Sequence, residues 1–376
     1  MLSFKSTAAA VLAIALFVVL AIILLAALWP FDFFPHNDVA WLKGRNGLDF
    51  GRNPVVLSRA PFHFADPSWS SISLEIWTQP TGHWRESTFL SFYTPENPQQ
   101  FRMMYFNNVF LIRRARMDAK GQWHDNAIGV DNAAFPGTPL FITITAGPQG
   151  TSIYLNGKLA ERSSNYILTG RDFSGQLIFG TSPFEKQTWH GAWRGLAICG
   201  AELSQSDVAA HFQKWTGGRQ KELLHESVPT ALYDFHEGTG DTAHDLAGVA
   251  PDLFIPKHYS VPHKAILEWP WKEFHPTRSY AVDVAVNIAG FIPFGFLLTA
   301  LLWSTTRNHR PVLTAILAGA FLSLTIELLQ GYIPQRASGM TDVITNTLGT
   351  ATGAIICGQR NVLLLFAKWF GLTRPD

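Results

Sequence analysis

Residues 152–159, SIYLNGKL, give the clearest local indication of the fold in the largest part of this 376-residue chain. Residues 153–155 form a short apolar run of the kind found in strands, and Asn156 and Gly157 follow it directly. An Asn-Gly pair suits a type I′ turn, because both central residues of that turn need a positive φ. The stretch therefore predicts a β-hairpin.

An alternating pattern precedes this hairpin. In residues 71–76, Ile72, Leu74 and Ile76 share one face, and polar residues including Glu75 share the other. Such alternation predicts an antiparallel strand with one face in the core and one in solvent. Glu75 is accordingly interpreted as a solvated strand residue.

Short runs of the same kind recur between turn signals rich in Gly, Pro and Asn. They lie at residues 101–105, 109–112, 141–145, 152–155, 176–179 and 196–199. Many short strands with few helices predict an all-β sandwich or jelly roll.

Several motifs in this segment follow one another in a characteristic order. They are GLDF at 47–50, SLEIW at 73–77, LIFG at 177–180, WRGLAI at 193–198 and a short helix at 204–211. In this order they resemble a LamG-like, or concanavalin A-like lectin/glucanase, jelly roll. The resemblance implies a domain over residues 44–259, with the displaced stretch 231–248 closing the sandwich.

Binding is the expected role of this domain. Related glucanases carry an E-x-D-x-x-E strand, because retaining hydrolysis needs two neighbouring carboxylates, and no such run occurs here. Trp84, Trp123 and Trp189 are candidates for stacking on sugar rings, with burial in the core as the alternative for each. The resemblance also implies calcium as a possible cofactor, although the spacing assigns no metal ligands.

Outside this segment the chain is apolar. Only 15% of its residues are charged, against about 25% in ordinary soluble domains. Four stretches predict an all-α transmembrane bundle: residues 7–29, 283–303, 312–329 and 342–357, the last being short. A cleaved signal peptide is the alternative for the first, but its length and its Trp29-Pro30-Phe31 ending favour a retained anchor.

Basic residues predict the orientation of these spans. Lys5 precedes the first, Arg307 and Arg310 separate the second and third, and further basic residues follow the fourth. Positive loops stay in the cytoplasm, so both termini are expected there and residues 30–280 outside. Residues 358–376 form a cytoplasmic tail, in which 362–370 predicts a surface helix or an extension of the fourth span.

The overall charge and the cysteine count exclude several classes. Lys plus Arg total 29 and Asp plus Glu total 28, which is unlike a nucleic-acid-binding protein. Two cysteines are too few for a disulfide framework or a thiolate metal site.

Polar residues within the predicted spans repeat a helical spacing. Asp283 and Asn287, Ser323 and Glu327, and Asp342 and Asn346 are each four residues apart, which places each pair on one helix face. The predicted topology brings them to the outer rim of the bilayer, with Arg336 as counter-charge to Glu327 or Asp342. Glu327, Arg336 and Asp342 form either a buried, charge-balanced clamp or a site for an anionic or amphiphilic lipid-linked ligand. For Asn287, Asn346 and Ser323, hydrogen bonding between helices is the alternative to a direct role. The whole predicted cluster comprises Asp283, Asn287, Glu327, Gln330, Arg336, Asp342 and Asn346.

The same residues belong to a second set of ordered motifs. These are Asp283 with NI at 287–288, FIPFG at 291–295, SLTIELLQ at 323–330, IPQR at 333–336 and DVITNTLG at 342–349. They resemble a VanZ-like domain, here residues 283–357 together with the first span. The resemblance implies a role at the bacterial cell envelope in resistance to the glycopeptide teicoplanin.

Three other intramembrane or flanking features are expected to be structural. Gly349 and Gly353 fit a close-packing helix seam. His275 and His309 have no paired ligands nearby and are interpreted as surface residues.

The sequence therefore predicts a multi-pass protein of the bacterial cytoplasmic membrane whose external lectin-like domain binds envelope carbohydrate or glycoconjugate. Membrane lipid and an envelope glycan or lipid-linked precursor are its expected partners. The alternative is a membrane enzyme or transporter that acts on a lipid-linked envelope precursor through Glu327, Arg336 and Asp342. A scaffold whose jelly roll binds protein is a third possibility.

Overall fold

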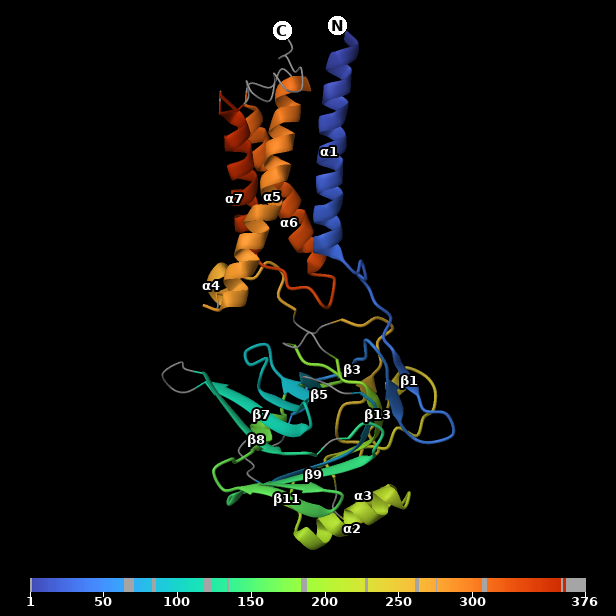
Figure 1. Ribbon diagram of the computed structural model, residues 1–376. Helices are drawn as coiled ribbons and strands as arrows, with labels where there is room; N and C mark the ends of the chain where they lie inside the picture. Colours follow the sequence, from blue (N-terminus) through green and yellow to red (C-terminus); the bar gives the residue numbers. More distant parts are fainter. Residues whose placement is uncertain are drawn as a thin grey trace. The chain divides into compact units, whose positions relative to one another are not determined.

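The chain divides into two compact units. A computed structural model describes residues 2–63, 71–82, 86–117, 123–133, 135–183, 188–226, 229–260, 264–274, 276–305, 310–359 and 361–362. One unit combines residues 1–34 with 264–376, and the other comprises residues 35–263. The first is helical and the second is a β-sandwich (Figure 1).

The sandwich unit contains two antiparallel sheets, each eight-stranded in the described residues. The first sheet has, in spatial order, β1 (Val39–Trp41), β2 (Leu48–Phe50), β13 (Gly191–Cys199), β4 (Ile72–Pro80), β9 (Leu140–Gly147), β10 (Gly150–Leu155) and β11 (Lys158–Ser163), with β14 (Ala231–Tyr233) beside β13. The second has β15 (Thr242–Ala243), β16 (Leu253–Phe254), β3 (Val56–Ser58), β12 (Gln176–Phe179), β5 (Glu86–Tyr93), β6 (Phe101–Phe106), β7 (Val109–Met117) and β8 (Trp123–Val130).

The predicted β-hairpin and the closure of the sandwich are confirmed. β10 and β11 pair antiparallel with Leu155 opposite Lys158, and Asn156 and Gly157 have φ values of 50° and 78°. β14, from the displaced stretch, pairs with β13 in the first sheet. β16 pairs with β3 in the second.

The inward-facing side chains of both sheets form one aromatic-rich core. Phe89 is central to it, because its ring contacts those of Tyr105, Trp189 and Trp193. Burial of such large rings is the main source of stability for a sandwich of this kind.

β4 is buried on both faces, so the prediction that one face is wet is wrong. Ile72, Leu74 and Ile76 face the core as expected, but the alternate face is covered by helix α2 (Gln205–Thr216). Ser204 begins this helix with a capping box that includes Asp207. The short elements η1 (Gly170–Phe173), η2 (Gln220–Glu222) and α3 (Leu223–Glu226) complete the unit.

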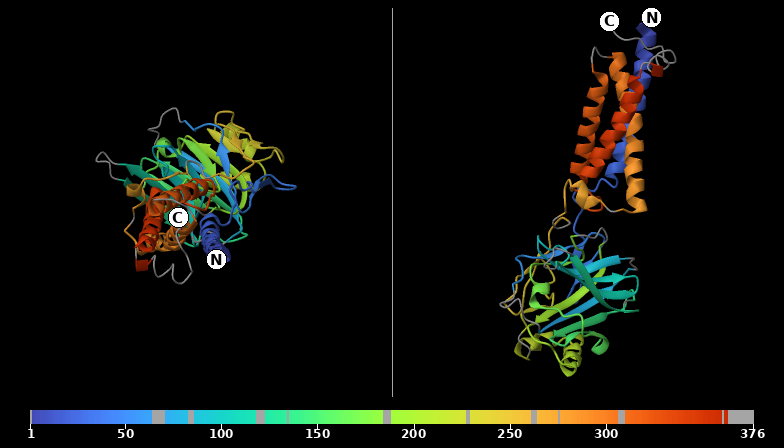
Figure 2. Two further views of the ribbon diagram at one scale, coloured as in Figure 1. Left: turned by 90° about the horizontal axis from the view of Figure 1, so that it is seen from above. Right: turned by 90° about the vertical axis from the view of Figure 1, so that its left-hand side faces the viewer.

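The described part of the helical unit contains one long N-terminal helix and three long helices from the second half of the chain, which run side by side (Figure 2). They are α1 (Leu2–Leu28), α5 (Arg278–Thr305), α6 (Pro311–Gln330) and α7 (Met340–Gly358), with the short helix α4 (Pro270–Glu273) before α5. Within the described residues, three helices are long and apolar enough to cross a membrane: α1, α5 and α6. α7 forms where the fourth span is predicted, but its frequent polar residues keep it out of that group.

Close packing of α5 against α7 depends on glycine, as predicted. A side chain at Gly349 would collide with the carbonyl oxygen of Ile288, and one at Gly353 with that of Ile292. Thr350 approaches Gly295 in the same way. The helix backbones therefore approach more closely than larger residues would allow.

Four predictions fall partly or wholly outside the described residues. They concern the surface positions of His275 and His309, residues 363–370 of the predicted tail helix, and Trp84.

Candidate functional site

The predicted polar residues gather at one end of the helical bundle. α1 and α6 end there, and α5 and α7 begin there (Figure 2). Asn287 of α5 donates through Nδ2 to Asp342 Oδ1 of α7 at 2.7 Å. Asn346, one turn further along α7, donates to Ser323 Oγ of α6 at 2.9 Å. Asp283 is exposed, one turn before Asn287. These two bonds join α5 to α7 and α7 to α6. They match the helix-packing alternative for Asn287, Asn346 and Ser323.

Arg336 does not pair with Glu327 or Asp342, so that prediction is wrong. Its Nη2 donates to the carbonyl oxygen of Ala26 at 2.7 Å, and its Nε donates to that of Trp29 at 3.1 Å. Gln330 adds a third bond, from Nε2 to the carbonyl oxygen of Ala27 at 2.9 Å. The last carbonyls of a helix lack intrahelical donors and carry partial negative charge. Arg336 therefore donates to the unsatisfied carbonyl oxygens at the end of α1 and not to a carboxylate.

The carboxylates instead gather at the positive end of α7. Glu327 is only 1% exposed and accepts from the backbone N–H of Gly339 at 2.8 Å. Glu273 of α4 accepts from the backbone N–H of Thr341 at 3.0 Å. Carboxylates are stabilised near a helix N-terminus by the macrodipole. No lysine or arginine within the described ranges lies at ion-pair distance from Glu327 or Asp342.

Two members of this bundle end were missed in the sequence. Glu273 lies in a short segment before the span, where no periodic pattern marks it. Lys264 donates through Nζ to the carbonyl oxygen of Gln330, the last residue of α6, and to that of Ile333 just beyond the helix. Both are charged residues close to helix ends. Such a role can be predicted only when the positions of the neighbouring helix ends are known.

The tryptophans proposed for sugar stacking lie in different environments. Trp189 is fully buried, against Phe50, Phe89 and Trp193. Its ring has no open face, so its assignment to a sugar-binding surface is wrong. The side chain of Trp123 and the whole of Trp84 lie outside the described part of the chain.

Glu75 is also buried, contrary to its interpretation as a solvated residue. It is 0% exposed, and its carboxylate contacts His211 Nδ1 at 2.8 Å and Trp215 Nε1 at 3.1 Å. Both partners belong to α2, which covers this face of β4. A carboxylate enclosed in this way has no path to a glycosidic bond.

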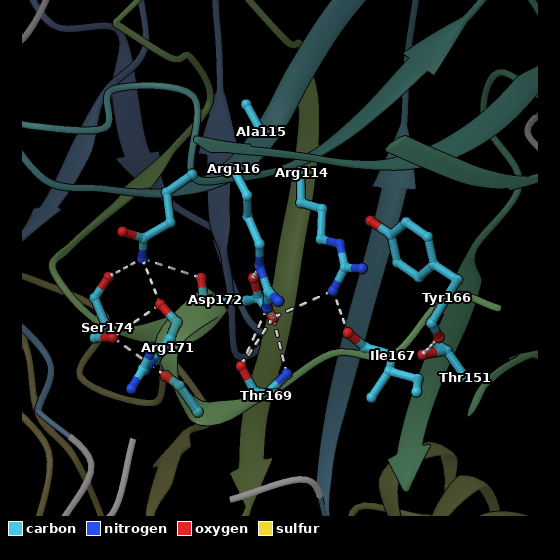
Figure 3. A network of polar contacts seen from close by, with 12 residues as sticks. Arg114, Ala115, Arg116, Thr151, Tyr166, Ile167, Thr169, Arg171, Asp172 and Ser174 are labelled. Atoms are coloured by element: carbon cyan, nitrogen blue, oxygen red, sulfur yellow. Dashed lines mark hydrogen bonds and ion pairs between the residues drawn. The ribbon is translucent and has the colours of Figure 1, made fainter. Parts of the chain in front are cut away.

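One network of polar contacts in the sandwich unit was not predicted from the sequence (Figure 3). We call Arg114, Arg116, Arg171 and Asp172 the arginine cluster. Arg114 and Arg116 follow Phe110 and Ile112 on the inward face of β7. Asp172 lies in η1, and the backbone oxygens around it accept from Gln100 Nε2.

Asp172 is the centre of the arginine cluster. Its side chain is 2% exposed, and Arg116 reaches it through Nε at 3.2 Å and Nη2 at 2.5 Å. Such a two-pronged contact fixes the plane of the guanidinium. The backbone N–H of Thr169 also donates to Asp172, at 2.8 Å.

Arg114 is held inside the protein. It donates to the carbonyl oxygen of Ile167, lies over the ring of Tyr166 at 4.7 Å, and approaches Asp172 at 3.8 Å. Burial, followed by repulsion from Arg116, lowers the pKa of the Arg114 guanidinium. The Arg114 side chain is thus enclosed by the protein, in contrast to that of Arg116.

No group of three or more His, Cys, Asp or Glu side chains that could hold a metal ion occurs in the described ranges. The possible calcium cofactor of the jelly roll stays a prediction.

Comparison with known families matches both parts of the chain. Residues 56–209 match the concanavalin A-like lectin/glucanases superfamily, and residues 241–365 match the VanZ/LLP1 family. The chain thus combines a concanavalin A-like domain with a VanZ-like region, which is the composition predicted from the sequence. The VanZ/LLP1 match begins within the sandwich unit, at the strands β15 and β16.

Solved structures give more distant similarities. A protein from Bacteroides ovatus ATCC 8483 that is proposed to bind carbohydrate is 12% identical, with a TM-score of 0.40 over 58% of this chain and 62% of that one. The binding domain of botulinum neurotoxin DC, in complex with rat synaptotagmin II, is 15% identical, with a TM-score of 0.35 over 48% of this chain and 46% of that one. The matched regions thus span about half to three-fifths of those structures. No curated protein matches the chain by sequence.

Proposed function

We propose that this protein is a multi-pass protein of the bacterial cytoplasmic membrane that binds envelope carbohydrate or glycoconjugate through its concanavalin A-like domain. The observation that carries the proposal is the union, in one chain, of a sandwich from a lectin and glucanase superfamily with three helices apolar enough to cross a membrane. The helical unit anchors the domain at the membrane. The sandwich recognises the sugar.

Binding is favoured over hydrolysis by the surroundings of Glu75. A glycosidase needs two carboxyl groups that flank the scissile bond. Glu75 is enclosed by His211 and Trp215 beneath α2, and it therefore acts in packing and not in catalysis.

The proposed topology has four spans, with α7 as the fourth. Both termini then lie in the cytoplasm and the sandwich lies outside. The aromatic residues at the end of the bundle where α1 stops support this arrangement, because Trp29, Trp269 and Trp271 are all more than half exposed. Tryptophan is enriched at membrane–water interfaces.

The test is a binding screen with the full chain in nanodiscs of zwitterionic lipid. Immobilised envelope polysaccharides, peptidoglycan fragments and teicoplanin are the probes, with and without calcium. Saturable binding of at least one glycan supports the proposal. A folded protein that binds none of them contradicts it.

A contribution to glycopeptide resistance or envelope integrity belongs to the same proposal. Cells that express the chain are expected to tolerate more teicoplanin than cells that lack it. Equal susceptibility of the two strains would remove resistance from the proposed role.

A second candidate function is supported by the unpaired carboxylates at the bundle end. Glu327 is buried without an ion pair in the described ranges, and buried charges of this kind within membranes often belong to functional sites. The protein would then act as an enzyme or transporter on a lipid-linked precursor. Turnover or transport by the purified chain, abolished in Glu327→Gln, is the expected result; no activity on such precursors would exclude it.

A further inference from the structure

The arginine cluster has a net positive charge, because it contains three arginines and only one aspartate. The guanidiniums of Arg114 and Arg116 lie within ion-pair distance of the single carboxylate of Asp172, and Arg171 directly precedes Asp172 in the chain (Figure 3). The difference between three positive charges and one negative charge is a surplus of two. Arg171 is exposed, so part of this surplus faces solvent.

The side chain of Arg116 contacts the interior on one side and is exposed to solvent on the other. Its Nε and Nη2 atoms bind Asp172, and Nη2 also donates to Thr169 Oγ1 at 3.1 Å. Its Nη1 makes no hydrogen bond within the described ranges, and the side chain is 44% exposed. Asp172 thus fixes the orientation of a guanidinium that still has donors available to an external acceptor.

The strand register places further polar groups beside Arg116. His124 of β8 lies directly opposite Arg116, and Asn126 lies opposite Arg114. Paired residues in an antiparallel ladder share a face, so these exposed side chains continue the polar surface. Asp125, the carboxylate of β8, lies opposite Ala115 on the alternate face, where it pairs with Arg113. It therefore does not neutralise Arg116.

Apolar surface adjoins these donors. Ile167, whose carbonyl oxygen holds Arg114, is 36% exposed. Sugar rings present both apolar C–H faces and polar edges. Surfaces that combine a few oriented polar groups with apolar contact suit such ligands.

We propose that Arg116 and Arg171 bind a carboxylate or phosphate group of an acidic glycan at this end of the sandwich, with Asp172 positioning Arg116. The inference rests on the proposed carbohydrate-binding function and names its ligand class. The free Nη1 of Arg116 would donate to an anionic oxygen of the ligand, and Arg171 would add a second positive charge. Both carboxylate and phosphate present such oxygens.

The experiment measures binding of the full chain, in nanodiscs of zwitterionic lipid, to three polymers of matched length. These are polygalacturonate, phosphorylated dextran and neutral dextran. At least one acidic polymer is expected to bind at least about tenfold more tightly than neutral dextran. The acidic polymer that binds identifies the anionic group, and its binding should weaken as salt is added.

Two variants locate the site. Arg116→Gln is expected to weaken acidic-polymer binding by about tenfold or more. Arg171→Gln should weaken it as well, and this substitution leaves Asp172 and its partners in place. Arg219→Gln is the matched control, because Arg219 is an exposed arginine after α2, at the first sheet. An unchanged melting temperature confirms that each variant is folded.

The outcomes separate this inference from the broader function. If neutral dextran or another neutral glycan binds as tightly as the acidic polymers, or if Arg116→Gln and Arg171→Gln bind like the Arg219→Gln control, the inference is overturned and carbohydrate binding stands. If the folded protein binds no glycan in the wider screen, the proposed function fails, and the inference fails with it.

Discussion

His211 Nδ1 lies 2.8 Å from Glu75 Oε1, in a position where neither side chain is more than 5% exposed. The contact joins α2 to β4, although the two residues are 136 positions apart in the chain. Trp215 donates to the other carboxylate oxygen. The pair therefore fixes the helix over the central part of the first sheet.

Replacement of Glu75 by alanine should destabilise the sandwich by about 3 kcal/mol, because it leaves two buried donors without their acceptor. Glu161→Ala is the control, since Glu161 is exposed on β11, and such surface changes stay within about 0.5 kcal/mol. Urea unfolding followed by tryptophan fluorescence measures both. Equal stability of the two variants would refute the role assigned to Glu75.

Glu75 also shows how far the sequence could be interpreted. Its alternating neighbours correctly predicted a strand, because side-chain direction along a strand is a local property. Its environment depends on α2, which lies far along the chain and covers the face that an isolated sheet would expose. The Asn156–Gly157 turn could be predicted for the opposite reason, because two positive φ values are a property of the two residues themselves.

The bundle end shows the same limit. The four-residue spacing correctly placed Asn287 and Asp342 on faces that meet. It did not indicate that Arg336 would bind the carbonyls at the end of α1, some 300 residues earlier in the chain. The charge of Arg336 suggested a carboxylate partner. Its acceptors are instead the unsatisfied carbonyl oxygens at the end of α1.

A double-mutant cycle of Arg336→Gln and Asp342→Asn should show independent effects. The two side chains contact different helices, so their coupling energy is expected to stay below about 0.5 kcal/mol. Thermal unfolding of the four proteins in detergent gives the cycle. Coupling above about 1 kcal/mol would restore the ion pair that the sequence suggested.

The close packing of α5 against α7 can be tested by a substitution that adds one methyl group. Gly353→Ala places a Cβ against the carbonyl oxygen of Ile292, and such overpacking typically costs about 1–3 kcal/mol. Gly290→Ala is a matched control in α5, where a Cβ meets nothing within 4 Å. The first variant should melt at a lower temperature in detergent, and the second should not. Similar melting temperatures would argue against close backbone contact.

The capping box of α2 makes the stability of the sandwich depend on pH. Hydrogen bonds from the side chain and the backbone N–H of Ser204 lower the pKa of Asp207 below its ordinary value of 3.8. A lowered carboxyl pKa stabilises the folded state above the ordinary value, and that contribution is lost as the pH falls through the lower, folded value.

Ser204→Ala should therefore cost about 1 kcal/mol at neutral pH and less in acid, once Asp207 is protonated. Asp207→Asn is the companion variant, and its deficit should shrink in the same way. Urea unfolding at about pH 7 and about pH 3 measures the change. A deficit that is constant across this range would mean that the Asp207 charge does not contribute to the cap.

The most direct test of the proposed role is co-sedimentation of the nanodisc-embedded chain with insoluble bacterial cell-wall material, in competition with purified polysaccharides. We predict that the protein sediments with the wall and that a soluble glycan releases it in a saturable manner. Sedimentation that no glycan reduces, or no sedimentation by a folded protein, would contradict carbohydrate recognition by the concanavalin A-like domain.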